Sequence, residues 1–229
     1  VFTGKGCVAS LRAWADDPIH SLVYTHGHVD HVGGSGHFVR DGEARGHAAP
    51  QVIGHEAVEA RFERYRATNG WNLAINARQF GGVRGDFGMG ETPDFIPTTT
   101  LWPTHVVDDH DSITVGDRSI ELHHARGETD DHLWSWLPKQ RAIMSGDFLI
   151  WNFPNAGNPQ KVQRYLSDWG AALRQMAALR PEILLAGHGL PIFGADRIVV
   201  ALTDTAELLE SIESQTLAIM NQGKNLDTC

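Results

Sequence analysis

The alternation of hydrophobic and polar positions predicts a chain in which short strands interleave with amphipathic helices. Near the N-terminus we expect a helix over 6–17, strands over 21–25 and 51–54, and a charged helix from about Glu56 to Ala67. Further along, the pattern predicts strands over 109–116, 119–124, 132–137, 141–145 and 182–186. Because helices and strands interleave, the fold class is α/β with layered sheets.

Three further segments complete the pattern. Residues 68–100 have little periodicity and are expected to be irregular, which in a compact domain is typical of a functional or disordered segment. Asn158 and Pro159 are typical of a helix start, and an apolar face follows from Val162 to Leu179. From about Ala195 to Asn221 one long helix is predicted, either capping the domain or beginning a dimer-forming element, so that a homodimer is one expectation.

Composition narrows the classes of partner. A formal net charge of −9 disfavours nucleic acid, since the electrostatic term would be repulsive. No apolar run is long enough to span a membrane, and no signal peptide opens the chain, so localisation stays open between cytoplasm and periplasm. The two cysteines, Cys7 and Cys229, form neither a disulfide framework nor a cysteine-type zinc site. The expected partner is a small-molecule substrate. The 13 histidines prompt a search for the spacing of metal ligands, because histidine is the commonest of them.

A dense group of ligand-type residues follows the strand predicted over 21–25. His26, His28, Asp30 and His31 form an H-x-H-x-D-H cluster in the segment THGHVDHVGGSG, which we expect to be a loop. The alternating offset directs two imidazoles at one point, and the turn into the next helix directs Asp30 and His31 at a second point. Three nitrogen donors and a carboxylate suit Zn²⁺, Fe²⁺ or Mn²⁺. The cluster therefore predicts a metal site.

This cluster resembles the signature of the metallo-β-lactamase superfamily. The resemblance implies a four-layer αβ/βα sandwich, with metals at one edge and the remaining ligands on later loops. It implies His188, in Ala-Gly-His-Gly-Leu-Pro, as the last histidine ligand, and Asp147, in Met-Ser-Gly-Asp-Phe at a strand end, as the carboxylate that bridges two metals. We expect residues 1–195 to form the catalytic domain, leaving open whether N-terminal strands precede it, and 196–229 to form a C-terminal helical segment.

The third histidine of the family pattern is replaced here. Most members carry Pro-Gly-His-Thr, whereas this chain reads Ala-Arg-Gly-Glu-Thr-Asp-Asp-His, which puts Glu128 at that position. A carboxylate can bind zinc there, and it favours Mn²⁺ or Fe²⁺ slightly more than an imidazole does. His124 and His132 remain alternative ligands. Glu128 resembles the alkyl-sulfatase branch, as do the segments around Arg-Phe-Glu-Arg-Tyr and Leu-Leu-Glu-Ser-Ile-Glu.

The resemblance implies a hydrolase with two divalent ions, Zn²⁺ first and Mn²⁺ or Fe²⁺ as alternatives, that uses a metal-bound hydroxide on an alkyl sulfate or related ester. The alternatives are another hydrolase of the same fold (a lactonase, β-lactamase or thioesterase) and, of a different class, a di-iron redox protein. Asp30 and Asp147 would act at the reacting centre, with His132 as a general acid or as an outer partner of a ligand.

Residues for binding the substrate are expected in the irregular segments. An anionic sulfate requires amide or cationic donors, for which the candidates are Asn72, Asn76, Arg78, Asn152 and Asn155. An apolar channel for an alkyl chain is a further hypothesis, and the aromatic side chains that would line it are Trp71, Phe80, Phe87, Phe95, Trp102, Trp151 and Phe153.

Overall fold

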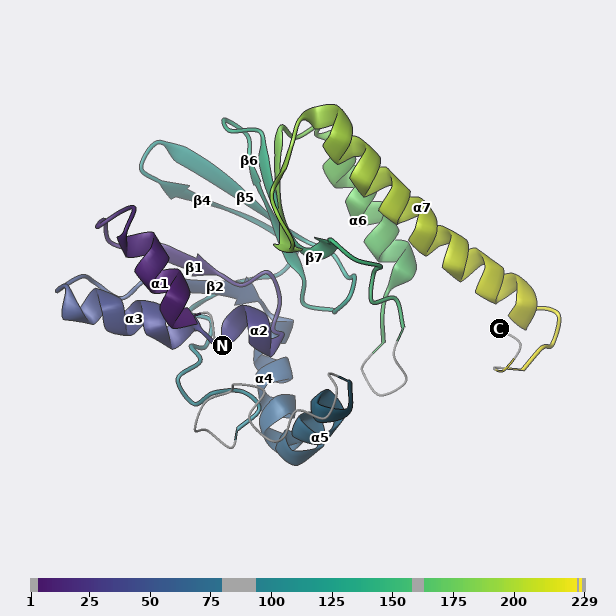
Figure 1. The fold of residues 1–229 in the computed structure, drawn as a ribbon, viewed down its shortest axis with the longest axis horizontal. Helices are drawn as coiled ribbons and strands as arrows, with labels where there is room; N and C mark the ends of the chain where they lie inside the picture. The colour runs from purple at the N-terminus through teal and green to yellow at the C-terminus, as the bar shows by residue number, and fades with distance from the viewer. Residues whose placement is uncertain (1–3, 80–93, 158–162, 226, 228–229) are drawn as a thin grey trace. The chain divides into compact units, whose positions relative to one another are not determined.

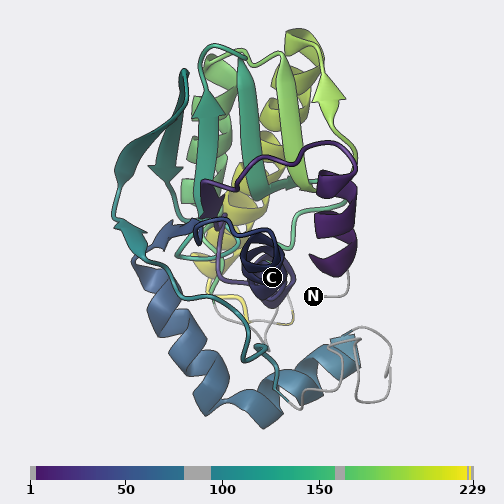
Figure 2. The same cartoon turned by 90° about the vertical axis from the view of Figure 1, so that its left-hand side faces the viewer.

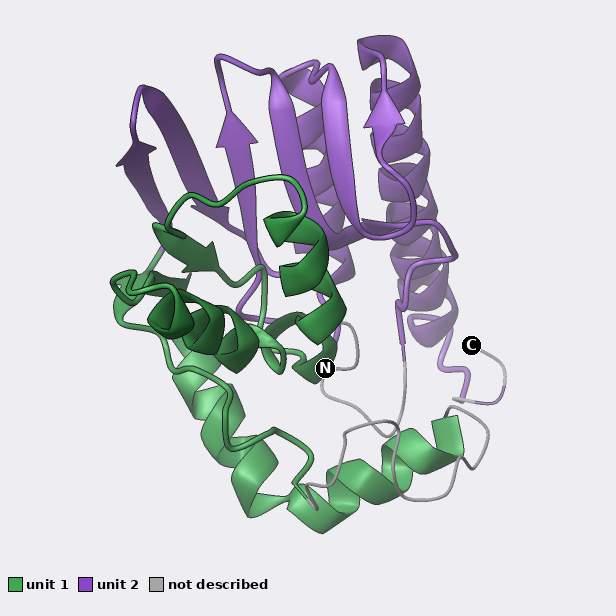
Figure 3. Ribbon diagram, turned by 60° about the vertical axis from the view of Figure 1, so that its left-hand side comes forward, with its two compact units in different colours: residues 1–108 green, residues 109–229 purple. Residues whose placement is uncertain are grey.

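The structure is a computed structural model that describes residues 4–79, 94–157, 163–225 and 227. The chain forms two compact units, residues 1–108 and 109–229 (Figure 3). Both combine helices with a sheet, which confirms the expected α/β class. In the described part of the chain, none of the helices is both long and apolar enough to cross a membrane.

The first unit is built on a parallel sheet in the order β1-β2-β3. Its strands are β1 (Ser21–Val23), β2 (Gln51–His55) and β3 (His105–Val107). Because the strands are parallel, their carboxyl ends lie along one edge, where the segment after β1 carries the histidine cluster. The helices, labelled in Figure 1, are α1 (Gly4–Arg12), α2 (Val29–Val32), α3 (Ser35–Ala44), α4 (Ala57–Ala67) and α5 (Asn69–Gln79). Their core includes Tyr24, Val32, Val52, Val58, Phe62 and Tyr65.

Two sequence predictions for this unit were wrong. The segment expected to be a loop contains α2 and the start of α3, and part of the segment expected to be irregular is helix α5. The buried face of α5 carries Asn72 as well as Ile75, so a polar residue interrupts the apolar periodicity. Asn72 is tolerated inside because its Nδ2 donates to the carbonyl of Thr68 at 3.0 Å, which satisfies the buried amide.

The second unit is built on a six-stranded sheet in the order β4-β5-β6-β7-β8-β9, antiparallel except for the β7–β8 pair. The strands are β4 (His110–Val115), β5 (Arg118–His124), β6 (Leu133–Leu137), β7 (Ala142–Ile150), β8 (Ile183–His188) and β9 (Ile192–Phe193). Helices α6 (Leu166–Ala178) and α7 (Ala195–Met220) pack on one face of this sheet, behind the strands in Figure 2. The long C-terminal helix is thereby confirmed, whereas the boundary at residue 195 stays a prediction.

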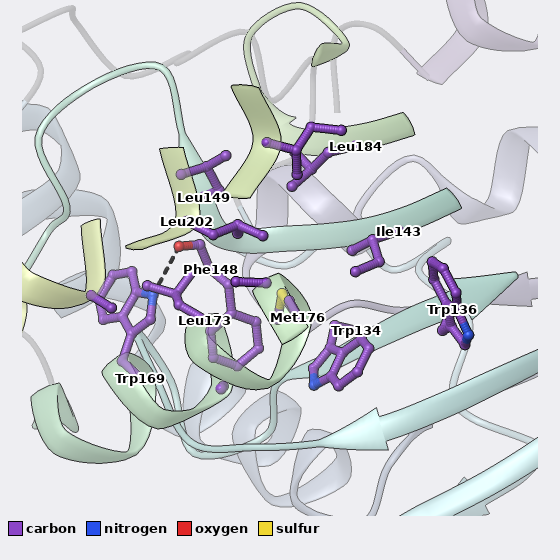
Figure 4. Close-up of a cluster of buried hydrophobic side chains, with 14 of the residues drawn as sticks. Trp134, Trp136, Ile143, Phe148, Leu149, Trp169, Leu173, Met176, Leu184 and Leu202 are labelled. Atoms are coloured by element: carbon purple, nitrogen blue, oxygen red, sulfur yellow. Dashed lines mark hydrogen bonds between the residues drawn. The ribbon is translucent and has the colours of Figure 1, made fainter. Parts of the chain in front are cut away.

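A large apolar cluster joins these helices to the sheet (Figure 4). Trp169 of α6 is fully buried in it, and its indole Nε1 donates to the carbonyl of Phe148 at 2.9 Å. Helix α6 begins at Leu166, and residues 163–165 before it are not helical, whereas the predicted helix start at Asn158 and Pro159, like Val162, lies outside the described residues. The hydrogen bond from Trp169 holds β7 at Phe148, next to Asp147, one of the predicted metal ligands.

Strand β7 is longer and less regular than the sequence predicts. It runs to Ile150, so Asp147 lies within the strand and not after it. Its pairing with β8 shifts register on both sides of Gly146, whose φ of 52° is readily adopted by glycine. These irregularities allow Phe148 and Leu149, although consecutive, both to join the apolar cluster.

Candidate functional site

The first unit gathers four predicted ligands at the carboxyl end of β1. Tyr24 still pairs with β2, its N–H donating to the carbonyl of Ile53 at 2.8 Å, and the chain then leaves the sheet. The rings of His26 and His28 lie 4.5 Å apart between centroids, and those of His26 and His31 lie 4.2 Å apart. Three imidazoles thus occupy one small region, as the sequence predicts.

The individual contacts show how this region is arranged. Nε2 of His26, which is fully buried, lies 2.9 Å from Nδ1 of His28, and Oδ2 of Asp30 lies 3.4 Å from Nε2 of His31. Thr25 was missed in the sequence: its Oγ1 lies 3.1 Å from Nδ1 of His26 and orients that ring. The side chain of Asp30 is 54% exposed, so a water molecule can reach it while the histidine it contacts is mostly buried.

The second unit gathers the three later ligands. Ligand atoms of Glu128 and Asp147 lie within 4.8 Å of each other, and Oδ2 of Asp147 lies 3.6 Å from Nε2 of His188, the last residue of β8. Both carboxylates are buried, whereas His188 is more than half exposed. Two buried carboxylates side by side repel each other when ionised, so the arrangement favours either a shared proton or a bound cation. The donor set therefore fits a divalent metal.

The titration of Glu128 reflects this environment. The pKa of Glu128 is raised from 4.5 to about 7, chiefly by burial, and the neighbouring carboxylate of Asp147 acts in the same direction. Arg164 and Asn155 oppose this shift, because a guanidinium and an amide donor favour the ionised form.

Arg164, like Thr25, is a residue of the candidate site that the sequence did not reveal. Its side chain is only 3% exposed, its Nη2 lies 3.2 Å from Oε1 of Glu128, and its Nη1 donates to the carbonyl of the same residue. Nδ2 of Asn155 donates to the same Oε1 at 2.7 Å, and Nε of Arg164 donates to the carbonyl of Asn155 at 3.2 Å. No spacing or motif in the sequence distinguishes this arginine from a surface residue.

Asp147 is held by its backbone and by close packing. Its N–H donates to Nε2 of His132 at 3.2 Å, and the buried ring of His132 stacks on Phe148 with 4.2 Å between centroids. A Cβ atom at Gly187 would lie 2.0 Å from Oδ1 of Asp147, so only glycine fits beside this carboxylate. This geometry favours His132 as an outer partner over a general acid.

Three residues, Glu128, His124 and His132, are candidates for the ligand that replaces the third histidine of the family pattern. Nε2 of His124 donates to the carbonyl of Asp130 at 3.1 Å, and Nε2 of His132 accepts from Asp147. Of the three, Glu128 has its ligand oxygen beside that of Asp147. The geometry thus favours the carboxylate as the ligand, although the assignment stays a prediction.

The predicted substrate-binding residues divide into two groups. On α5, Asn72 donates to the carbonyl of Thr68, just before the helix, and Asn76 donates to the carbonyl of Asn72. The guanidinium of Arg78 lies 5.8 Å from the ring centroid of Trp71. After β7, Asn152 caps the N–H of Phe153 at 2.8 Å, and Asn155 supports Glu128. Of these five residues, Asn155 is the one that contacts a candidate metal ligand, and it does so by donating to Glu128 and not by binding substrate.

The aromatic candidates for an apolar channel behave differently from one another. Trp71, Trp151 and Phe153 are exposed, whereas Phe95 and Trp102 belong to or pack against the core of the first unit. Phe80 and Phe87 lie outside the described residues. Of the exposed three, Trp151 and Phe153 follow shortly after β7, the strand that carries Asp147.

Comparison with known proteins identifies a family and its sequence relatives. The family model of the metallo-beta-lactamase superfamily matches residues 3–188. The chain is 24% identical over 231 residues to the linear primary-alkylsulfatase of Pseudomonas sp. (strain ATCC 19151), covering 96% of this chain and 43% of the relative. It is 26% identical over 242 residues to the alkyl/aryl-sulfatase BDS1 of Saccharomyces cerevisiae, covering 97% and 37%. The chain thus spans less than half the length of these relatives.

Solved structures show the same fold. The stereoselective inverting sec-alkylsulfatase Pisa1 from Pseudomonas sp. superposes with a TM-score of 0.77 at 20% identity, covering 99% of this chain and 38% of that one. The BLEG-1 B3 metallo-beta-lactamase gives a TM-score of 0.58 at 18% identity, covering 90% and 84%. The predicted sandwich fold is confirmed, and the relatives support the alkyl-sulfatase-like branch.

Proposed function

The chain belongs to the metallo-β-lactamase superfamily, and we propose that it carries the active site of a metal-dependent hydrolase of alkyl sulfates or related esters. The observation that carries the proposal is the buried carboxylate of Glu128, held by Arg164 and Asn155 at the position where most of the family has histidine. Curated relatives along nearly the whole chain are alkylsulfatases, which supports the same substrate class.

The proposed ligand assignment follows the family pattern. On this pattern His26, His28 and Glu128 would hold one divalent ion and Asp30, His31 and His188 a second, with Asp147 contributing to both. Support comes from the donors within each unit, where neighbouring imidazole and carboxylate ligand atoms lie 2.9 to 3.6 Å apart. Zn²⁺ is the first choice because the set mixes imidazole with carboxylate, and Mn²⁺ or Fe²⁺ are the alternatives.

When bound, such ions lower the pKa of water and polarise an ester oxygen. The remaining chemistry belongs to side chains of this chain. Asp30, half exposed, can accept a hydrogen bond from the attacking water and orient its lone pair toward the ester. Arg164 favours the ionised form of Glu128, and His132 fixes the backbone from which Asp147 extends.

The apolar part of the substrate would contact the segment after β7. Trp151 and Phe153 are 58% and 61% exposed, and they follow directly on the strand that carries Asp147. We propose that they receive the alkyl chain, because burying such surface against a hydrocarbon is favourable by roughly 25 cal/mol per Å². Affinity would then rise with chain length.

The test is sulfate release from a panel of primary and secondary alkyl sulfates, measured with metal content on the same protein. Turnover of sulfates with at least two ions per chain is expected, faster for longer chains, and Glu128→Ala should abolish turnover while Glu121→Ala, on β5, should not. If the protein hydrolyses lactones, β-lactams or thioesters but none of the alkyl sulfates, it is a hydrolase of another class. Oxygen-dependent redox activity of a di-iron form would overturn the hydrolase proposal.

A further inference from the structure

A second cluster of ligand-type side chains lies on the β4–β5 hairpin of the second unit. His110 of β4 is the direct cross-strand partner of His123 of β5. Glu121 lies two residues before His123, and side chains two apart on a strand point to the same face. The ring centroids of the two histidines lie 4.7 Å apart, and Nε2 of His123 lies 3.4 Å from Oε2 of Glu121.

The three side chains offer ligand atoms that all lie within 4.8 Å of one another. This spacing results from the antiparallel register, which brings directly opposed side chains close together. None of the three belongs to the ligand sets proposed above, so the cluster is separate from the hydrolase chemistry.

The ring of His123 is held in place from behind. It stacks on the indole of Trp134 with 4.2 Å between centroids and 14° between planes. Trp134 is 2% exposed and anchored in the apolar cluster drawn in Figure 4. A ligand whose orientation is fixed by packing loses little entropy on binding a metal, which makes the site partly preorganised.

The site is also open to solvent. The side chains of His123 and Glu121 are 27% and 35% exposed, and His110 is exposed. An ion can therefore enter from solution, and water can complete its coordination.

We propose that His110, Glu121 and His123 form an additional binding site for a divalent transition-metal ion. Two imidazoles and one carboxylate are the ligand set that suits Zn²⁺, with Cu²⁺ and Ni²⁺ as competitors. Ca²⁺ and Mg²⁺ are disfavoured, because both require mostly oxygen ligands. The bound ion would clamp β4 to β5 at the edge of the sheet.

The test counts metal ions in the complete chain. Wild type and the double variant His110→Gln/His123→Gln are dialysed against the same low-micromolar Zn²⁺ and analysed by mass spectrometry for zinc and protein. The variant is expected to carry one ion fewer per chain, with unchanged hydrolysis of whatever ester the wild type turns over. His20→Gln, which removes an exposed histidine outside both clusters, should leave the count unchanged.

A second measurement shows whether the loss of zinc in the double variant results from misfolding. The single variant His110→Gln leaves the His123–Trp134 stack in place, so its circular dichroism should match that of wild type while its zinc count falls by one. Equal zinc counts in wild type and both variants would overturn the proposal, as would an equal loss in His20→Gln. Because the readout is the metal count, it does not depend on whether the hydrolase proposal is correct.

Discussion

Arg164 and Glu128 form an ion pair in which Nη2 lies 3.2 Å from Oε1 and both side chains are almost completely buried, at 3% and 8% exposure. Removing charges from water is costly, so such a pair is tolerated only when each partner is well satisfied. Here Arg164 also donates to the Glu128 carbonyl and to that of Asn155, which leaves the guanidinium well bonded. The pair fixes the orientation of the carboxylate that replaces the usual histidine.

Breaking this pair should be costly. Arg164→Met leaves the buried carboxylate without its cation and is expected to lower the free energy of unfolding by about 3–5 kcal/mol, measured by urea denaturation. The matched control is Arg174→Met, whose partner Glu210 is bonded with similar geometry but at 45% and 42% exposure, and which should lower stability far less because solvent screens the pair. Equal costs for the two variants would contradict a special role for Arg164.

The stability of the metal-free protein should depend on pH through Glu128. Its pKa is about 7 when folded against 4.5 as the ordinary value, so between these values the folded state holds a proton that the unfolded chain has released. This contribution is complete below pH 4.5 and is lost as the pH rises through 7.

Glu128→Gln removes that titration. The free energy of unfolding of wild type relative to the variant should therefore fall between pH 5 and pH 8, by on the order of 1–3 kcal/mol in the presence of a chelator. Glu210→Gln serves as the control. Arg174 lowers the pKa of Glu210, so this carboxyl group stays ionised between pH 5 and pH 8. A pH-independent difference for Glu128→Gln would show that its proton is not retained on folding.

Gly187 should resist even the smallest substitution. Gly187→Ala would put a Cβ 2.0 Å from Oδ1 of Asp147 and 2.8 Å from the backbone of Gly146, and the backbone cannot move aside easily. We expect a loss of roughly 1–3 kcal/mol in stability together with weaker metal binding, followed by thermal melting and metal titration. Gly157→Ala is the control, since no atom in the described part of the chain comes within 4 Å of its added Cβ.

His132 should act through its acceptor nitrogen. In His132→Leu the N–H of Asp147 loses its partner, and an unsatisfied buried group costs about 1–3 kcal/mol. Metal affinity should fall about 10- to 100-fold, as for other outer partners of ligands. His132→Gln retains an acceptor and should recover part of the affinity; if Gln and Leu weaken metal binding equally, packing on Phe148 and not the hydrogen bond is what matters.

The parts that sequence predicts well are those specified locally. The strands β1 and β2 and helix α7 follow from apolar periodicity over a few residues. Four candidate ligands lie within six positions, from His26 to His31, so one segment carries them. Glu128, Asp147 and His188 were predicted from family motifs; the second unit brings them close together, and their role as ligands stays a prediction.

What the sequence could not predict depends on contacts between distant residues. Arg164 acts on Glu128 across 36 positions, and no local pattern marks it. Helix α5 was missed because the buried Asn72 is satisfied by Thr68, which hides the helical periodicity behind a polar residue. The extension of β7 past Ser145 depends on pairing with β8, and the glycine in the middle looks like a turn.

The irregular half of β7 has a consequence for the order in which the unit folds. The strand pairs regularly with β6 only from Ala142 to Met144, and beyond that the Asp147 N–H and the Phe148 carbonyl bind the side chains of His132 and Trp169. Trp169 belongs to α6, which must dock before its indole can reach the strand. The Asp147 carboxylate is therefore expected to reach its final orientation late in folding, and its amide should exchange with solvent deuterium together with the amides of α6 and faster than that of Ile143.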